Sequence, residues 1–263
     1  MNNKLQVIVS IAGLFLTIIL IVFSMCVIED KKGSENIEDT AEVSVETTDK
    51  FIPKMSGWVD VNEANLMKEP SESSDVADTL FFNEKITYVD YDDKWGKTSI
   101  NDEDVYVLLS DIKNHETESH YYEIPTNTGF KSFMDYSSIT LTSSLQYKIQ
   151  NSYATTGDYG IRMVGNRYCI ALGSHFSSDI GQYVDLILKN GTVIPCILSE
   201  QKDDMHTDYN NIITVNNGCL SEFIVDTDSL NNDVLKYGDI SYCNDEWNSP
   251  VVSIKIYDKN LFN

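Results

Sequence analysis

The sequence RYCIALGSHFSSDIGQYVDLILKNGTVIPCIL, residues 167–198, decides the fold of the larger part of this chain. Two runs rich in β-branched and aliphatic residues, 183–188 and 192–198, flank the pair Asn190-Gly191. Such a pair between two strand-like runs is the strongest short-range signal for a β-hairpin, because both central residues of the turn must accept positive φ. We therefore expect a hairpin here, preceded by one more apolar strand.

Further strand-like runs follow this hairpin toward the C-terminus. They lie at 222–225 and 251–257, with the segment 238–242 between them. Short strands separated by turn residues, without long helical patterns, are typical of a compact barrel. The sequence predicts that residues 155–263 form an all-β barrel.

A second series of short alternating segments precedes this region. It begins at 57–61, and polar turns separate its members, which lie at 64–67, 77–82, 85–91, 95–99 and 105–109. This spacing predicts a small barrel of about 60 residues over 55–114. The connector, residues 115–154, is polar around Pro125 and then mixes hydroxyl and apolar residues, which suits two short helices or a helix followed by a strand.

The first 28 residues differ from the rest of the chain. Residues 5–28, LQVIVSIAGLFLTIILIVFSMCVI, contain no charged side chain and are about long enough to cross a hydrocarbon core as a helix. Lys4 precedes this run, which favours a cytoplasmic N-terminus and an external remainder. A cleaved signal peptide is the competing interpretation, but the run exceeds a typical apolar signal region and no A-x-A site closes it. We expect an uncleaved membrane anchor over 1–28.

The acidic and polar segment 29–54 shows no sustained periodicity, so we expect a flexible stalk. The whole chain has 263 residues, with 19 Lys and Arg against 41 Asp and Glu, and its formal charge is −22. Only two arginines are present, Arg162 and Arg167. Proteins that bind nucleic acid need a basic face, so this class of partner is excluded, and the exported part is expected to attract cations.

The cysteines agree with export without proving it. Cys26 lies in the expected anchor, and Cys169, Cys196, Cys219 and Cys243 lie in the C-terminal part. They are either small buried thiols in strands or one or two disulfides, and four cysteines allow three pairings. No C-x-x-C pair is present, so no structural zinc site is expected.

The segment 55–114 resembles a bacterial SH3 domain (SH3b). The family's motifs are matched by ANLMKEP at 64–70, NEKITYV at 83–89, KWGKT at 94–98 and VYV at 105–107. The resemblance implies a module that holds cell-wall peptide or glycan beside another domain. Trp58 and Trp95 are candidates for stacking on such a ligand, although tryptophans in so small a barrel are more often core residues.

Residues 155 to about 258 resemble the double-psi β-barrels of peptidoglycan-active proteins: the three-aspartate domain, the membrane-bound lytic transglycosylase A type and the rare lipoprotein A type. The shared pattern is matched by ALG at 171–173, IGQYVDL at 180–186, NGTV at 190–193 and GDI at 238–240. Leu172 stands near the place of the family's first aspartate. The resemblance implies a domain that binds or cleaves glycan strands, with a closing strand near 238–240.

Lytic transglycosylases need one carboxylic acid with a raised pKa to protonate the glycosidic oxygen. The loop 200–208 concentrates ionisable groups directly after a buried strand, and their mutual repulsion can raise one pKa. We expect Asp204 or Glu200 to be the acid, Asp239 a second carboxylate and His206 a residue that orients the acid. The competing interpretation is an acidic surface turn without catalytic function.

Two other kinds of site are weaker predictions. Asp204, His206 and Asp208 alternate, so on a strand they would share a face and could hold a divalent cation, but solvated turn residues are more common. A cysteine nucleophile would need His175 or His206 beside a cysteine, and the cysteines lie in apolar runs that favour burial. We expect neither a metal nor a cofactor.

The sequence therefore predicts a mainly β protein with an N-terminal transmembrane helix, an SH3-like barrel and a double-psi-like barrel. We expect it on the outer face of the cytoplasmic membrane of a Gram-positive-type bacterium, anchored by residues 5–28. Its expected partners are peptidoglycan or the stem peptides of peptidoglycan. The alternative is a non-catalytic module that binds the wall or another envelope protein.

Overall fold

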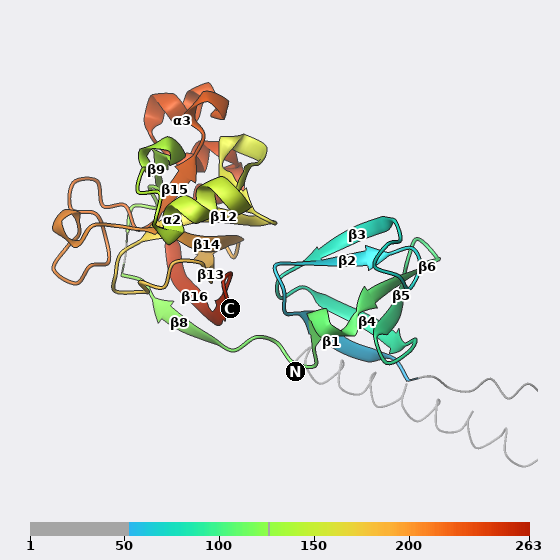
Figure 1. Ribbon diagram of the computed structural model, residues 1–263. Helices are drawn as coiled ribbons and strands as arrows, with labels where there is room; N and C mark the ends of the chain where they lie inside the picture. The colour runs from blue at the N-terminus through green and yellow to red at the C-terminus, as the bar shows by residue number, and fades with distance from the viewer. Residues whose placement is uncertain (1–52, 126) are drawn as a thin grey trace, which may run out of the picture. The chain divides into compact units, whose positions relative to one another are not determined.

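The computed structural model describes residues 53–125 and 127–263, and residues 51–263 form one compact unit. The anchor expected at 5–28 and the stalk up to residue 52 lie outside the described residues. The described part of the chain folds mainly into β-strands, which form two sheets (Figure 1) and confirm the mainly β class. None of its helices is long and apolar enough to cross a membrane.

The first sheet contains seven strands in the order β3-β2-β6-β5-β4-β1-β7, and every pair of neighbours is antiparallel. Its strands are β1 (Met55–Val59), β2 (Glu63–Met67), β3 (Val76–Phe81), β4 (Lys85–Asp90), β5 (Trp95–Ile100), β6 (Glu103–Leu108) and β7 (Ile112–Lys113), with the 3₁₀ turn η1 (Leu109–Asp111) before β7. These bounds agree with the alternating segments of the sequence. The alternate residues bury a small apolar cluster, namely Val59, Ala64, Leu66, Ile86, Val105 and Val107.

A two-residue turn joins β5 to β6. Asn101 and Asp102 both have positive φ, 51° and 66°, and they separate the paired residues Ile100 and Glu103. Asn and Asp tolerate this conformation better than other residues with a side chain, and the turn matches the right-handed twist of the strands. This turn thus has the backbone geometry that the sequence predicted for Asn190-Gly191.

The second sheet follows the order β10-β11-β12-β14-β13-β16-β8, and β15 joins it by pairing with both β12 and β9. Its strands are β8 (Ser119–Glu123), β9 (Ser132–Asp135), β10 (Thr155–Thr156), β11 (Arg162–Val164), β12 (Arg167–Leu172), β13 (Gln182–Leu188), β14 (Val193–Gln201), β15 (Glu222–Val225) and β16 (Val251–Asn260). The pairs β12–β14 and β15–β9 are parallel, and the other pairs are antiparallel. The large apolar cluster of the protein lies among these strands.

The expected hairpin forms between β13 and β14, but its turn differs from the prediction. Only Gly191 has positive φ, 91°, and the Leu188 N–H donates to the Thr192 carbonyl, which closes a loop of residues 189–191. The Asn190 side chain accepts from the Thr192 N–H and donates to the Glu246 carbonyl. This loop is therefore fixed by contacts to a distant segment as well as by its own turn.

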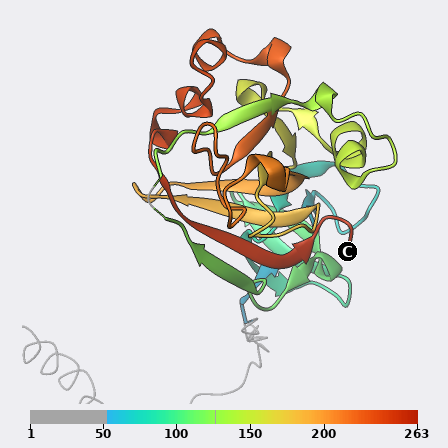
Figure 2. The ribbon, with the colours of Figure 1, turned by 90° about the vertical axis from the view of Figure 1, so that its left-hand side faces the viewer.

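The connector, residues 115–154, contains the short helical elements expected from the sequence, but two strands that were not expected precede them. These are β8, which runs beside β16 (Figure 2), and β9, which pairs with β15. A short helical stretch comes only afterwards. It consists of the 3₁₀ turn η2 (Tyr136–Ser138), the helix α2 (Leu145–Lys148) and the π-helical turn η3 (Ile149–Tyr153).

The segment 238–240, expected near a closing strand, is not a strand. The helix α3 (Asn232–Tyr237) ends at Gly238, which adopts the left-handed conformation with φ 69°, and the 3₁₀ turn η7 (Ile240–Cys243) follows. The remaining 3₁₀ turns are η4 (Asp158–Gly160), η5 (Asp204–His206), η6 (Thr227–Ser229) and η8 (Asp245–Trp247). Gly238 thus caps the C-terminus of α3, a position where glycine is common.

Phe82 connects the two sheets. It follows β3, yet it is buried in the large cluster, where its ring stacks on Tyr183 with centroids 4.1 Å apart and meets the Tyr257 ring edge-on at 5.3 Å. The neighbouring Asn83 adopts positive φ and accepts a hydrogen bond from the Thr117 N–H. One aromatic side chain of the first sheet therefore belongs to the core of the second.

A buried ion pair lies beneath this aromatic contact. Arg167 donates to Asp185 at 2.8 Å and also to the backbone carbonyls of Val184 and Cys196, while the Tyr257 hydroxyl donates to the same aspartate at 2.6 Å. The Arg167 guanidinium lies 5.3 Å from the centre of the Phe82 ring. Both members of the ion pair have partners, which is the condition under which buried charges are tolerated.

Candidate functional site

Two glutamates lie in one row across the second sheet. Ala171 of β12 pairs with Glu200 of β14 on one side and with Glu222 of β15 on the other. Neighbouring strands lie about 4.8 Å apart, so the Cα atoms of the two glutamates are about 10 Å apart. The register between β12 and β14 shifts between Ile170 and Ala171, directly before this pair.

Glu200 is the glutamate of this row whose pKa is raised. Its side chain is half-buried near the end of β14, and it accepts hydrogen bonds from the Gln201 N–H at 2.9 Å and from Gln146 at 3.5 Å. Gln146 belongs to α2, which lies beside β14 (Figure 1). Burial raises the pKa of the Glu200 carboxyl above its ordinary value, and the charge of Glu222 adds to the rise while the two hydrogen bonds oppose it. A larger share of Glu200 is thus protonated near neutral pH than of an exposed glutamate.

Glu222 is held on its other side by β9. Its carboxylate accepts a hydrogen bond from the Ser132 hydroxyl at 3.2 Å, and Ser132 also contacts the buried Cys219 thiol, with Oγ and Sγ 3.0 Å apart. The sequence analysis did not name Glu222. A signal was present, because Glu222 stands directly before a buried run as Glu200 stands directly after one, but the pairing through Ala171 joins strands that are distant in sequence.

The other residues predicted for catalysis do not join this row. Asp204 is exposed and accepts a hydrogen bond from the Ser174 hydroxyl at 2.7 Å, and the exposed His206 imidazole makes no hydrogen bond to the described residues. Asp208 accepts from the N–H groups of Ile212 and Ile213, which hold the pKa of its carboxyl below the ordinary value against the effect of partial burial. Asp208 thus stabilises a loop, and Asp204 and His206 lie exposed on the same loop.

Asp239 lies in a different environment. Its carboxylate accepts from the N–H groups of Lys131 and Ser241, and it lines a cavity of 290 Å³ with Asp233, Ser241, Tyr242, Asp245 and Asn248. The buried Lys131 ammonium donates to the carbonyls of Gly129, Trp247 and Ser249. Asp239 therefore helps to position a buried lysine, and no hydrogen bond or ion pair of the described residues links it to Glu200.

The two tryptophans proposed for ligand binding occupy different places in the first sheet. Trp95 is buried and forms part of the wall of a cavity of 240 Å³ together with Asn65, Met67 and Leu108. Trp58 is partly exposed, and the Lys85 ammonium lies 5.2 Å from the centre of its ring. They do not form one aromatic platform.

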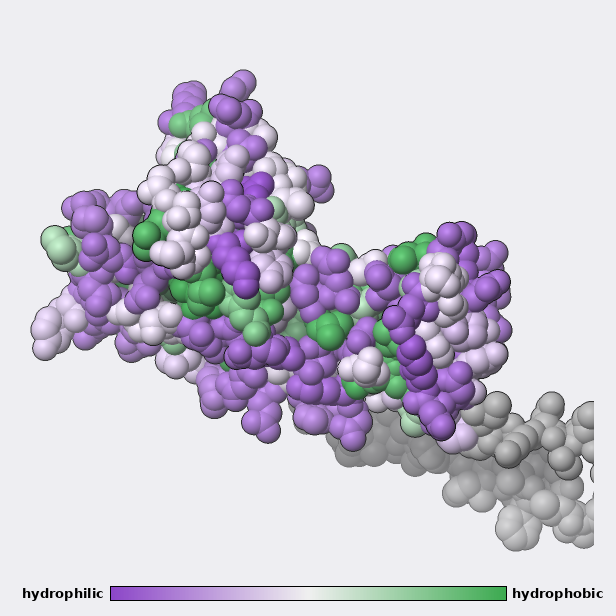
Figure 3. Space-filling model, viewed as in Figure 1, coloured by the Kyte–Doolittle hydropathy of each residue, from purple (hydrophilic) through white to green (hydrophobic). Residues whose placement is uncertain are grey.

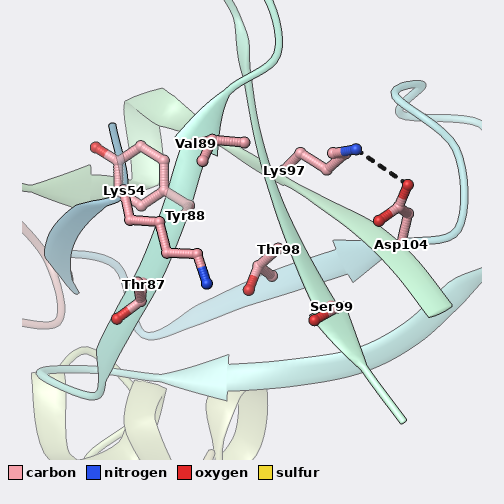
Figure 4. A pocket seen from close by; sticks show the side chains of 8 residues that line it. All are labelled: Lys54, Thr87, Tyr88, Val89, Lys97, Thr98, Ser99 and Asp104. Carbon is pink, nitrogen blue, oxygen red and sulfur yellow. Dashed lines mark hydrogen bonds and ion pairs between the residues drawn. The ribbon is translucent and has the colours of Figure 1, made fainter. Parts of the chain in front are cut away.

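A groove of 340 Å³ opens between β4 and β5 (Figure 4). These strands pair only at Val89 with Lys97 and at Asp90 with Gly96, and beyond these positions they separate. The lining residues are Lys54, Thr87, Tyr88, Val89, Lys97, Thr98, Ser99 and Asp104. Lys97 forms an ion pair with Asp104 at 3.1 Å, so the groove offers hydroxyl groups and the Lys54 ammonium to a polar ligand.

Metal and thiol sites are not formed by the described residues. Residues 53–125 and 127–263 contain no group of three His, Cys, Asp or Glu side chains placed to hold a metal ion. Cys169, Cys196, Cys219 and Cys243 carry no disulfide in the structure. Burial raises the pKa of the Cys169 and Cys243 thiols to about 11, which opposes a role as nucleophile.

The visible surface of the described residues is largely hydrophilic, and hydrophobic residues form small separate patches on it (Figure 3). No protein family, no curated protein and no solved structure matches this chain. The carboxylate row and the segments around it are therefore the features of the described residues from which we infer the function.

Proposed function

We propose that this protein is a membrane-anchored, extracytoplasmic peptidoglycan-cleaving protein that acts on glycan strands as a lytic transglycosylase, with Glu200 as the acid. The observation that carries the proposal is the half-buried Glu200 carboxyl, whose pKa is raised by burial and by the charge of Glu222, the second glutamate that pairs with Ala171. A general acid needs a proton at the working pH, and a second carboxylate nearby supplies negative charge for a positively charged sugar ring.

The reaction needs one proton donor. Protonated Glu200 donates its proton to the glycosidic oxygen as the bond between this oxygen and C1 of the muramic acid breaks, and the released saccharide leaves with a hydroxyl group. The 6-hydroxyl oxygen of the same muramic acid forms the new bond to C1, and its proton passes to the Glu200 carboxylate. The product is a 1,6-anhydro sugar, and the enzyme returns to its starting protonation state.

The other parts of the chain have supporting roles in this proposal. Residues 5–28 anchor the protein in the cytoplasmic membrane, and residues 29–54 act as a stalk. The first sheet is an SH3b-like module, and the second is a double-psi-like barrel that carries the acid. The mainly β structure with two sheets supports these assignments, as does a second sheet that mixes parallel and antiparallel pairs.

A non-catalytic module that binds the wall or another envelope protein is the second candidate. The groove between β4 and β5 favours it, because this hollow offers hydroxyl groups and a lysine ammonium to a polar ligand without any acid of raised pKa (Figure 4). In that case the second sheet contributes structure and no chemistry.

The experiment is incubation of residues 51–263 with purified peptidoglycan, followed by mass spectrometry of the soluble products and a pull-down on the insoluble wall. We expect anhydromuropeptides, and we expect Glu200→Gln to lower their rate of release by at least about 100-fold. Glu123→Gln is the matched control, since Glu123 is an exposed glutamate at the end of β8, outside the carboxylate row and the loop that follows Glu200.

The pH profile adds a second readout. Because the protonated form of Glu200 is required, activity is expected to fall as pH rises through the raised pKa of this carboxyl. Retention on the wall without soluble fragments would instead support the binding module. Absence of both fragments and retention would point to an envelope protein as the partner.

A further inference from the structure

The loop of residues 202–221 joins the two carboxylate-bearing strands. Glu200 lies one residue before the end of β14, and Glu222 is the first residue of β15. Both ends of the 202–221 loop therefore start at the carboxylate row. The side chains that this loop exposes to solvent therefore lie on a segment that is attached next to Glu200 at one end and next to Glu222 at the other.

Buried polar contacts fix the loop. The buried Lys202 ammonium donates to the Thr214 hydroxyl and to the Cys219 carbonyl, each at 2.8 Å, and so ties the start of the loop to its end. The Asp208 carboxylate accepts from two successive backbone N–H groups at 2.7 and 2.9 Å. Such contacts hold a single loop conformation, because an unpaired buried ammonium would be costly.

The tip of the loop rests against the end of β12. A Cβ atom on Gly173 would lie 1.9 Å from the Asn211 carbonyl oxygen, so this close approach requires glycine. The His175 N–H donates to the same carbonyl at 3.4 Å. Gly173 is two residues beyond Ala171, the centre of the carboxylate row, which places the tip of the loop near that row.

This ordered loop exposes large apolar side chains. Tyr209 is 100% exposed, Met205 is 85% exposed and Val215 is 65% exposed. Because the Tyr209 ring stays in water in the folded protein, it contributes no hydrophobic stabilisation to folding. Exposed aromatic residues that combine an apolar face with a polar hydroxyl are instead characteristic of binding surfaces.

We propose that the 202–221 loop is the glycan-holding element of the site and that the Tyr209 ring stacks on a sugar ring of the bound strand. The loop carries Asp203, Asp204 and Asp208, and this negative charge favours the neutral N-acetylglucosamine units over the anionic stem peptides. The inference rests on the proposed function for its substrate, and it assigns to Tyr209 the binding of that substrate.

The test uses the full-length chain in detergent, with the pentamer of N-acetylglucosamine and purified sacculi as probes. We expect Tyr209→Ala to weaken binding of both probes about tenfold and to raise KM for sacculi while kcat and the pH profile stay unchanged. Tyr209→Phe keeps the stacking face and is expected to bind within about twofold of the wild type.

Tyr121→Ala is the matched control, because Tyr121 is 60% exposed on β8 and outside the loop. The inference is overturned if Tyr209→Ala binds both probes like the wild type, or if Tyr209→Phe loses as much affinity as Tyr209→Ala. It also fails if Tyr121→Ala has the same effect as Tyr209→Ala.

The failure of this inference and that of the proposed function are distinguishable. If the wild type releases no anhydromuropeptides but binds the pentamer through Tyr209, the cleavage proposal fails and the role of the loop stands. If the wild type cleaves sacculi through Glu200 with a KM that Tyr209→Ala leaves unchanged, the cleavage proposal stands and the role of the loop fails.

Discussion

Both sheets consist of β-strands around an apolar cluster, but they differ in how far their charged side chains are buried. The first sheet has a small apolar cluster, and the pairs Lys97 with Asp104 and Lys68 with Asp75 are exposed to water. The second sheet has the large cluster and encloses the pair Arg167 and Asp185. The large core thus encloses both members of an ion pair, whereas in the first sheet even the largely buried Asp60 pairs with a lysine, Lys113, whose side chain is 40% exposed.

The largest expected effect comes from breaking the buried ion pair. Arg167→Met leaves Asp185 buried without its cation, and we expect a loss of about 3–5 kcal/mol in the free energy of unfolding. Lys97→Met removes the matching cation of an exposed pair in the first sheet and is expected to leave the midpoint of unfolding nearly unchanged. Urea denaturation of both variants measures the difference, and equal losses would show that burial does not separate the two sheets.

Phe82→Ala is the next largest change, because it removes the ring that the first sheet places in the core of the second. We expect a loss of about 3 kcal/mol, and we expect the two sheets to unfold separately. The chain has three tryptophans, Trp58 and Trp95 in the first sheet and Trp247 in the turn η8, where it packs in the large apolar cluster, so a Trp247→Phe background reports the first sheet alone. Val76→Ala on the exposed face of β3 is the control, and coincident transitions in Phe82→Ala would contradict the prediction.

Alkaline pH is expected to weaken the same junction. Burial raises the pKa of Tyr183 and of Tyr257 to about 12, above the value of about 10 in the unfolded chain. The folded state then binds more protons than the unfolded state between pH 10 and pH 12, so stability falls as pH rises through this window, by up to about 2 kcal/mol for each tyrosine. Denaturation at several pH values, with Tyr183→Phe as the comparison, measures this loss. A constant stability above pH 10 would argue against burial of these hydroxyls.

The smallest expected change in stability is at Glu200, where the substitution is expected to stabilise the protein instead of destabilising it. Its pKa is raised in the folded state, so ionisation near neutral pH opposes folding, and Glu200→Gln is expected to stabilise the protein at pH 7. The two proteins are expected to become equally stable as pH falls below the unfolded pKa, where both side chains are neutral. Thermal unfolding at pH 4 and pH 7 measures the difference. A Glu200→Gln variant less stable than the wild type at pH 7 would show that the carboxylate is structurally required.

The sequence contained enough information for strands whose signals are local. The turn residues and alternation between 57 and 109 correctly predicted six of the seven strands of the first sheet, β1 to β6, and the hairpin of β13 and β14 was also found. The strands β8 and β9 were missed because their partners, β16 and β15, follow about a hundred residues later, and no local pattern records such pairing. The prediction of a closing strand near residues 238–240 was wrong for a related reason. A glycine can end a strand or cap a helix, and Gly238 caps α3.

The same distinction applies to the candidate site. Glu200 was predicted because a carboxylate directly after a buried strand is visible in the sequence. Its partner Glu222 could not be paired with it, because the row depends on the register of three strands around Ala171. Asp204, His206 and Asp239 are close to Glu200 in sequence or in the expected pattern, but each has a separate set of contacts in the structure.

The four cysteines of the C-terminal part form no disulfide bond, which affects how the protein can fold when it is produced. Disulfide formation and reshuffling take seconds to hours and need an oxidant or an isomerase, whereas the folding of small domains takes microseconds to seconds. Because Cys169, Cys196, Cys219 and Cys243 stay reduced in the folded chain, the region can reach its native state without an oxidative folding pathway. Recombinant production in a reducing cytosol is therefore expected to yield the native fold of this region.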